Sequence, residues 1–189
     1  SMGNVSWLTA PSEAGMARQR LRMLGRFGVP LRRVAVVFNP DNAANSAAVE
    51  RLSGPAPNAL VPCPARSVED VERVVLSGRH DAADALLVLA DTLFTVHARR
   101  LVELTAQARL PAAYGARVFV DAGGLIAVYG DTGEIIRRTA SLVRRILGGE
   151  TPATLSSPRL RPQAALNLAA ARRLGLEVPR TLIARATVL

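Results

Sequence analysis

Continuous apolar runs separated by amphipathic segments constrain the fold of this 189-residue chain more than any other feature. The clearest runs are VAVVF at 34–38, ALLVL at 85–89 and LIAVYG at 125–130. Such runs are typical of parallel strands buried on both faces, because helices cover each side of a parallel sheet. Two shorter runs, ALVPCPA at 59–65 and LPAAYG at 110–115, complete five predicted strands. We therefore predict an α/β fold with a mostly parallel, doubly wound sheet and helices on both faces.

The spacing of apolar residues and breakers predicts how the elements between these strands are arranged. Pro62 and Pro64 cannot donate ladder hydrogen bonds, so their strand is expected to be short or at a sheet edge. A helix is predicted to follow residues 91–92 and to run to about Arg109, and the apolar pairs of a long helix before Gly148 are expected to face inward. The Pro-, Ser- and Thr-rich segment after Glu150 is predicted to be a linker, followed by a short strand, a helix and a last helical turn.

The net charge of +9 comes from arginine alone, because the chain contains no lysine. Nucleic-acid binders cluster basic residues on one face and interleave aromatic side chains, whereas aromatic residues make up only 4% of this sequence. The arginines are spread along predicted helices, opposite the apolar stripes, where a solvated role is expected. They include Arg18, Arg20, Arg22, Arg99, Arg100, Arg137, Arg138, Arg144, Arg145, Arg172 and Arg173. We expect no nucleic-acid partner.

No catalytic or metal-binding pattern is evident in the sequence. His80, His97 and Cys63 cannot form a zinc site of ordinary ligand spacing, and His97 shares a stripe with Leu101 and Leu104 that favours a partly buried structural role. Glycine-rich phosphate motifs and a nucleophile elbow are also lacking. We therefore expect no enzymatic activity, no metal and no cofactor. No membrane span is expected, and the opening residues do not resemble a signal peptide.

Candidate site residues follow from the predicted sheet, since ligands of open α/β sheets bind outside the carboxyl ends of the strands. This rule selects residues 39–46, 91–92, 114–119 and 129–132.

Several strings, in order, give the chain a resemblance to a known family. VAVVFNPDN, ALLVLADTLF, LPAAYGARVFVDAGGLIAVYG and ALNLAAARRLGLEVP resemble the ABC-transporter substrate-binding family, whose best-known members bind tryptophan or tyrosine. The resemblance covers residues 3 to about 186. It implies a receptor of two α/β lobes (a type I periplasmic-binding-protein fold), periplasmic or membrane-anchored outside the cell, that serves an ABC permease.

The resemblance also implies how the chain is organised. Residues 1–11 would come from a first lobe or hinge, 12–150 would form the α/β solute-binding lobe, and 151–189 would be a returning crossover with C-terminal helices. The chain would then be the carboxyl-terminal lobe of an importer receptor.

An amino-acid-like ligand brings a carboxylate and an ammonium group, and each suits a different part of the predicted edge. The carboxylate suits the helix amino-terminus after Asn39, where free N–H groups and the helix dipole favour an anion. Asp91 would pair with the ammonium, and the same residues could alternatively serve only as helix caps. The predicted ligand-binding residues are Asn39, Asn42, Asn45, Ser46, Asp91 and Thr92, with Tyr114 and Phe119 as an apolar wall.

Two other functions remain open at this point: the effector lobe of a sugar-repressor-like regulator and a flavodoxin-like signalling domain. A single lobe is expected to bind amino acids only weakly, because a clamshell encloses its ligand between two lobes. A homodimer is also expected, because Val5, Trp7 and Leu8 and the tail strings ALNL and LGLEVP would expose apolar side chains.

Overall fold

The computed structural model describes residues 11–52, 59–76, 83–155 and 160–189. The contacts within the chain divide it into two units. The sheet unit comprises Ser12–Tyr129 and Ala164–Leu189, and the second unit comprises residues 1–11 and Gly130–Gln163. The predicted hinge segment at 1–11, with Val5, Trp7 and Leu8, lies outside the described residues except for Pro11.

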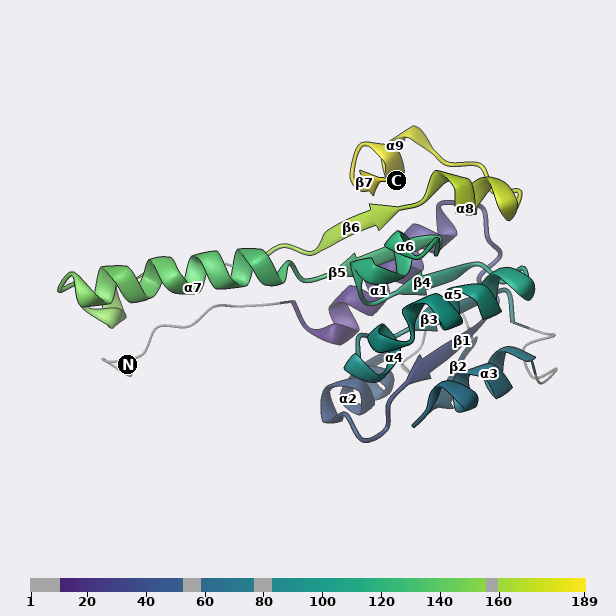
Figure 1. The fold of residues 1–189 in the computed structure, drawn as a ribbon, viewed down its shortest axis with the longest axis horizontal. Coiled ribbons are helices and arrows are strands. Elements are labelled where there is room, and N and C mark those ends of the chain that lie inside the picture. Colours follow the sequence, from purple (N-terminus) through teal and green to yellow (C-terminus); the bar gives the residue numbers. More distant parts are fainter. Residues whose placement is uncertain (1–10, 53–58, 77–82, 156–159) are drawn as a thin grey trace. The chain divides into compact units, whose positions relative to one another are not determined.

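A mostly parallel seven-stranded sheet, in the order β2-β1-β3-β4-β5-β6-β7, runs through the described chain (Figure 1). Pairing is parallel between β1 and both β2 and β3, between β3 and β4, between β4 and β5, and between β6 and β7. The five predicted strands are confirmed, and β2 lies at an edge, as its prolines predicted. The strands are β1 (Arg33–Phe38), β2 (Ala59–Pro64), β3 (Ala85–Val88), β4 (Ala112–Tyr114), β5 (Ile126–Tyr129), β6 (Gln163–Leu166) and β7 (Thr187–Val188).

Helices cover both faces of the sheet, which confirms the predicted fold class. One core cluster joins buried residues of α1, α2 and α8 to one face, and the other joins α3, α5 and α6 to the opposite face. Alternate residues of β1 enter the two clusters, because successive strand side chains point to opposite faces. The helices are α1 (Glu13–Gly25), α2 (Ala43–Leu52), α3 (Val68–Leu76), α4 (Thr92–Val96), α5 (Ala98–Gln107), α6 (Arg117–Asp121), α7 (Thr132–Leu147), α8 (Leu168–Arg173) and α9 (Arg180–Ile183), with a 3-10 turn at Pro152–Thr154.

Three expectations about helices were wrong. The helix predicted to run from 92 to about 109 is two helices, α4 and α5, and His97 between them is exposed rather than partly buried. No residue of α7 is buried, although its apolar pairs were expected to face inward; Leu147 is 83% exposed. Periodicity marks an apolar face on a helix, but it does not show whether another element covers that face.

The tail strings ALNL and LGLEVP, which were expected to expose apolar side chains, pack against the sheet core instead. Ala165 and Leu166 of β6 are fully buried, and Leu174, Leu176 and Val178 pack partly buried against the core. The final segment, predicted as a helical turn and an end, also adds the short strand β7. These two strings therefore do not supply the exposed surface on which the expected homodimer partly rested, and dimerisation stays a prediction.

No helix among the described residues is both long enough and apolar enough to cross a membrane.

Candidate functional site

Polar side chains from two neighbouring loops meet at the carboxyl ends of β1 and β3. The Asn42 Nδ2 atom donates to Oδ2 of Asp91 at 2.8 Å, and the Asn39 Nδ2 atom donates to Oδ1 of Asp91 at 3.3 Å. All three residues are half-buried. The structure thus brings together three residues that the sequence placed on separate loops, as expected where parallel strands end at one edge.

Two of these residues also cap helices. Oδ1 of Asp91 accepts the Leu93 N–H at 2.8 Å at the start of α4, and Oδ1 of Asn42 accepts the Ala44 N–H at 2.9 Å at the start of α2. The capping alternative and the cluster therefore coexist, because each side chain has more than one polar atom. Capping fixes the rotamer of each side chain and so fixes the geometry of the cluster.

Asn45 and Ser46 hold the loop from inside. Asn45 is 1% exposed, its Nδ2 atom donates to the Ala90 carbonyl at 2.9 Å, and its Oδ1 atom accepts the Asn39 N–H at 3.2 Å. The Ser46 hydroxyl donates to the Pro40 carbonyl at 3.1 Å. These two side chains, predicted as direct donors to a ligand, are thus engaged in shaping the loop.

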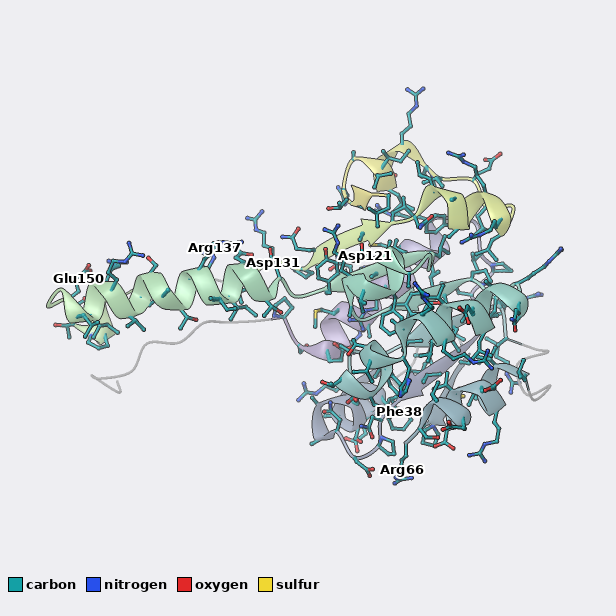
Figure 2. The ribbon with its side chains drawn as sticks, viewed as in Figure 1. Phe38, Arg66, Asp121, Asp131, Arg137 and Glu150 are labelled. Atoms are coloured by element: carbon teal, nitrogen blue, oxygen red, sulfur yellow. The ribbon has the colours of Figure 1, made fainter. Side chains whose placement is uncertain are left out.

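Asp91 differs from the nearby acid Asp41 in its partners. Asp41 lies exposed and pairs with Arg66, whose Nε atom is 3.1 Å from Oδ2 of Asp41; Figure 2 labels Arg66. Within the described residues, Asp91 forms no ion pair and is bonded only by neutral donors. Its negative charge is therefore not balanced by an arginine of the described chain.

Tyr114 and Phe119, predicted as an apolar ligand wall, lie in the core instead. Both are fully buried, and their rings stack with centroids 4.6 Å apart. The Tyr114 hydroxyl is 2.8 Å from Oγ1 of Thr105, and burial raises the pKa of Tyr114 well above its ordinary value. Aromatic residues close to a strand end pack inward when a helix covers that face, as α5 and α6 do here. The remaining predicted residue, Thr92, is exposed on the first turn of α4.

A buried ion pair beneath this edge was missed by the sequence analysis. Arg20 was assigned to a solvated helix face, but it is fully buried and forms an ion pair with Glu13. The Nε and Nη2 atoms of Arg20 donate to the Val128 carbonyl at 2.9 and 2.8 Å, and Oε1 of Glu13 accepts the Ala90 N–H at 2.9 Å. The available signal was spacing: both charges lie in one stripe with buried Ala17 and Leu24.

The β4–α6 connection passes very close to the same strand end. A Cβ atom at Gly115 would lie 2.5 Å from both the nitrogen and the Cα atom of Ala90. Only glycine permits this approach of two backbones. Ala90, the residue before Asp91, is therefore enclosed from several sides.

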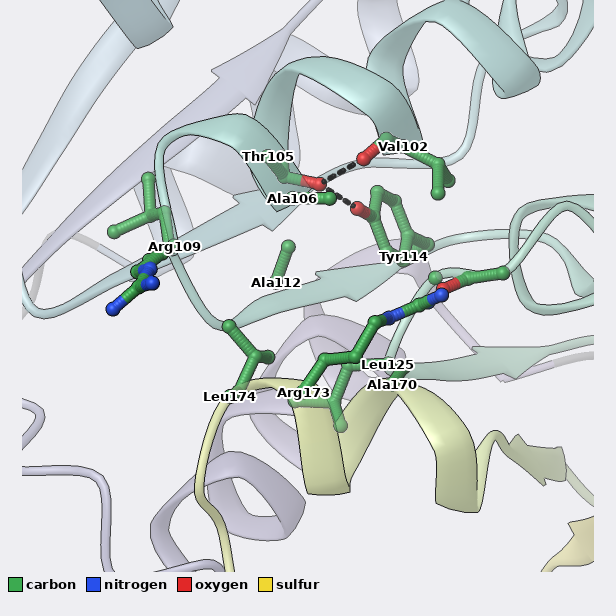
Figure 3. A pocket seen from close by; sticks show the side chains of 13 residues that line it. Val102, Thr105, Ala106, Arg109, Ala112, Tyr114, Leu125, Ala170, Arg173 and Leu174 are labelled. Atoms are coloured by element: carbon green, nitrogen blue, oxygen red, sulfur yellow. Dashed lines mark hydrogen bonds between the residues drawn. The ribbon is translucent and has the colours of Figure 1, made fainter.

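A separate pocket lies at the opposite ends of the strands. It has a cavity volume of about 100 Å³ and is lined by residues near the start of β4 and β5 and the ends of α5 and α8, including Ala112, Leu125, Arg109 and Arg173 (Figure 3). The Thr105 and Tyr114 hydroxyls in its wall bond to each other. The pocket therefore presents mainly apolar surface with two arginines at its rim, and it is distinct from the polar cluster.

No group of three or more histidine, cysteine or acidic side chains in the described part of the chain could hold a metal ion. The polar cluster offers one carboxylate and amide groups, which suit recognition of a cation or a zwitterion.

One comparison with known proteins identifies a family. A sequence model of the family described as ABC transporter substrate binding protein matches residues 6–189. No curated protein sequence matches the chain.

Solved structures of similar fold come from several bacteria. A conserved domain protein from Vibrio cholerae is 24% identical with a TM-score of 0.75, and 91% of this chain covers 59% of that one. An ABC domain from Streptococcus pneumoniae in complex with L-Trp is 17% identical with a TM-score of 0.78, with 98% and 65% of the two chains covered. A ligand-free, open substrate-binding protein with adhesive properties from Clostridium difficile is 16% identical with a TM-score of 0.73, with 91% and 59% covered. This chain thus spans less than two thirds of the length of these structural relatives.

Proposed function

Because this chain belongs to the ABC transporter substrate-binding protein family, we propose that it forms one lobe of an importer receptor for a small amino-acid-like solute. In this proposal the receptor works outside the cytoplasmic membrane and delivers its ligand to an ABC permease. The family match favours this function over the regulator and signalling alternatives.

The observation that carries the proposal is the unbalanced carboxylate of Asp91 within a preformed cluster. Asn39 and Asn42 hold both carboxylate oxygens in place without cancelling the negative charge. A ligand ammonium could therefore approach a fixed, half-buried anion, and charge-assisted hydrogen bonds of this kind are stronger than neutral ones. Asp91 is the proposed partner of the ligand ammonium.

The amino-terminus of α2 is the proposed partner of the ligand carboxylate. This helix has ten residues, and its dipole favours an anion near its first turn, where Asn42 accepts the Ala44 N–H. Asn42 connects the two parts of the proposed site, because it caps α2 and donates a hydrogen bond to Asp91. Asn45 and Ser46 support the loop, and exposed Thr92 lies at its rim. Buried Tyr114 and Phe119 take no direct part.

Because the ABC domain from Streptococcus pneumoniae was solved in complex with L-Trp, L-tryptophan is the first ligand to test. In a titration followed by amide NMR, we expect shifts at residues 39–46 and 91–93, with indole producing much smaller changes there. Binding should be weak, with a dissociation constant of about millimolar, because one lobe encloses only part of a ligand. Shifts confined to residues around the pocket, such as 105–110 and 173–174, would contradict the proposed site.

A further inference from the structure

We propose that Glu13 and Arg20 are positioning residues, whose buried ion pair fixes the carboxyl end of β3, and with it Asp91, relative to β5. The inference rests on the proposed function, in which Asp91 contacts the ligand.

The ion pair connects two strand ends through main-chain groups. Arg20 donates twice to the Val128 carbonyl, at 2.9 and 2.8 Å, and its guanidinium pairs with Glu13. Glu13 in turn accepts the Ala90 N–H at 2.9 Å. The connection therefore runs from β5 through two side chains of α1 to the residue that precedes Asp91.

The main-chain groups that the pair holds lie beyond the last residues of β3 and β5 that pair with β4. The register between β3 and its neighbours ends at Val88, and that between β4 and β5 ends at Ala127. The Ala90 N–H and the Val128 carbonyl therefore need partners from elsewhere in the fold, since buried backbone groups are costly when unpaired. The ion pair supplies both partners at once.

Ala90 is held on its other side as well. Its carbonyl accepts from Nδ2 of Asn45, and Gly115 brings the backbone of the next loop against it. With both of its polar groups bonded, the Ala90 residue has little freedom to move, and Asp91 follows it directly in the chain. Loss of the Glu13 contact would release one of these restraints.

Stability alone does not account for this ion pair. A buried pair can often be replaced by apolar side chains of similar volume without loss of stability, because desolvation opposes the Coulomb attraction. Apolar side chains cannot, however, accept the Ala90 N–H or donate to the Val128 carbonyl. The distinctive contribution of the charged pair is therefore the fixed spacing of the two strand ends.

The position of the pair in the sequence adds to this role. Glu13 is the second residue, and Val128 the next to last, of the stretch Ser12–Tyr129 that forms most of the sheet unit. The pair thus joins the beginning and the end of this stretch to the strand end that carries Asp91.

The test uses the full chain and the double variant Glu13→Met/Arg20→Met, which removes both charges together and so avoids an unpaired buried ion. Amide hydrogen exchange should become about tenfold faster at Ala90 and Leu93, because the restraint on this strand end is lost. Exchange at Tyr114 in the core should change little. The variant Glu13→Gln/Arg20→Met keeps an oxygen that can accept the Ala90 N–H but loses the bonds to Val128, so it should restore only part of the protection.

An exposed ion pair provides the matched control. Arg100 and Glu72 join α5 to α3 with side chains 45% and 33% exposed. The variant Glu72→Met/Arg100→Met should leave exchange at Ala90 and Leu93 at the wild-type rate.

Two results would overturn the inference: unchanged exchange at Ala90 in the Glu13→Met/Arg20→Met variant, or an equal rise at Ala90 and Tyr114, which would indicate general destabilisation. Titration with L-tryptophan separates this inference from the proposed function. If exchange rises selectively at Ala90 but the wild-type chain does not respond to L-tryptophan, the positioning role holds and the proposed ligand is wrong. If both hold, the double variant should bind L-tryptophan several-fold more weakly.

Discussion

The polar side chains at the carboxyl ends of β1 and β3 and those beside the pocket find their hydrogen-bond partners in different ways. At the carboxyl ends of β1 and β3, polar side chains bond to each other and to loop backbone, and the carboxylate of Asp91 keeps an unbalanced charge. In the wall of the small, mostly apolar pocket near the start of β4 and β5, the hydroxyls of Tyr114 and Thr105 bond to each other. The first arrangement leaves the Asp91 carboxylate without a cationic partner among the described residues. In the second, each hydroxyl already has a hydrogen-bond partner. The proposed site therefore rests on an unbalanced charge and not on a cavity.

The largest effect is expected at the close approach beside Ala90. The substitution Gly115→Ala would place a Cβ atom 2.5 Å from backbone atoms, which cannot rotate away as a side chain could. We expect a loss of about 3 kcal/mol in the free energy of unfolding, measured by chemical denaturation.

A glycine after the next strand provides the control. A Cβ atom at Gly130 would meet nothing within 4 Å, so Gly130→Ala should change stability by no more than about 0.5 kcal/mol. Equal effects of the two substitutions would show that the close approach does not constrain the β3 end.

A smaller effect is expected in the wall of the pocket. The substitution Tyr114→Phe removes one hydroxyl of a buried pair and should cost about 1 kcal/mol of stability. Thr105 keeps its bond to the Val102 carbonyl, so no buried donor is left unpaired. Binding of L-tryptophan should not change. Weakened binding would indicate that the ligand contacts the pocket and not the cluster around Asp91.

The pH dependence of stability sharpens the same comparison. Because burial raises the pKa of Tyr114, the unfolded chain loses this proton at lower pH than the folded chain does. The contribution of Tyr114 to stability is therefore fully present below its ordinary pKa and decreases as the pH rises above it. The Tyr114→Phe variant should lack this part of the decrease.

The sheet was predictable from the sequence because buried parallel strands need uninterrupted apolar runs, and β1, β3 and β5 have them. The covering helices were predictable where their apolar stripes pack on the core. The exposure of α7 was not predictable, since a stripe carries no information about its partner. The strand β7, only two residues long, is also too short to leave a pattern.

The candidate site was predictable in its location but not in its roles. Residues at parallel strand ends meet at one edge, which brought Asn39, Asn42 and Asp91 together. Whether a side chain faces a ligand or the loop backbone depends on local turns, and this separated Asn45 from Asn42. Arg20 was misassigned because a charge at helical spacing normally faces solvent, and its two carbonyl bonds to Val128 join residues 108 positions apart.

The central claim, that the Asp91 carboxylate recognises a ligand ammonium, is tested most directly by calorimetry with the Asp91→Asn variant. Asparagine can still cap α4 but carries no charge, and Asp41→Asn is the matched control because Asp41 is exposed and already paired with Arg66. The ligands are L-tryptophan and 3-indolepropionate, which lacks the ammonium. The wild-type chain and the Asp41→Asn variant should prefer L-tryptophan, and the Asp91→Asn variant should lose about tenfold of that preference. An unchanged preference in Asp91→Asn would contradict the account.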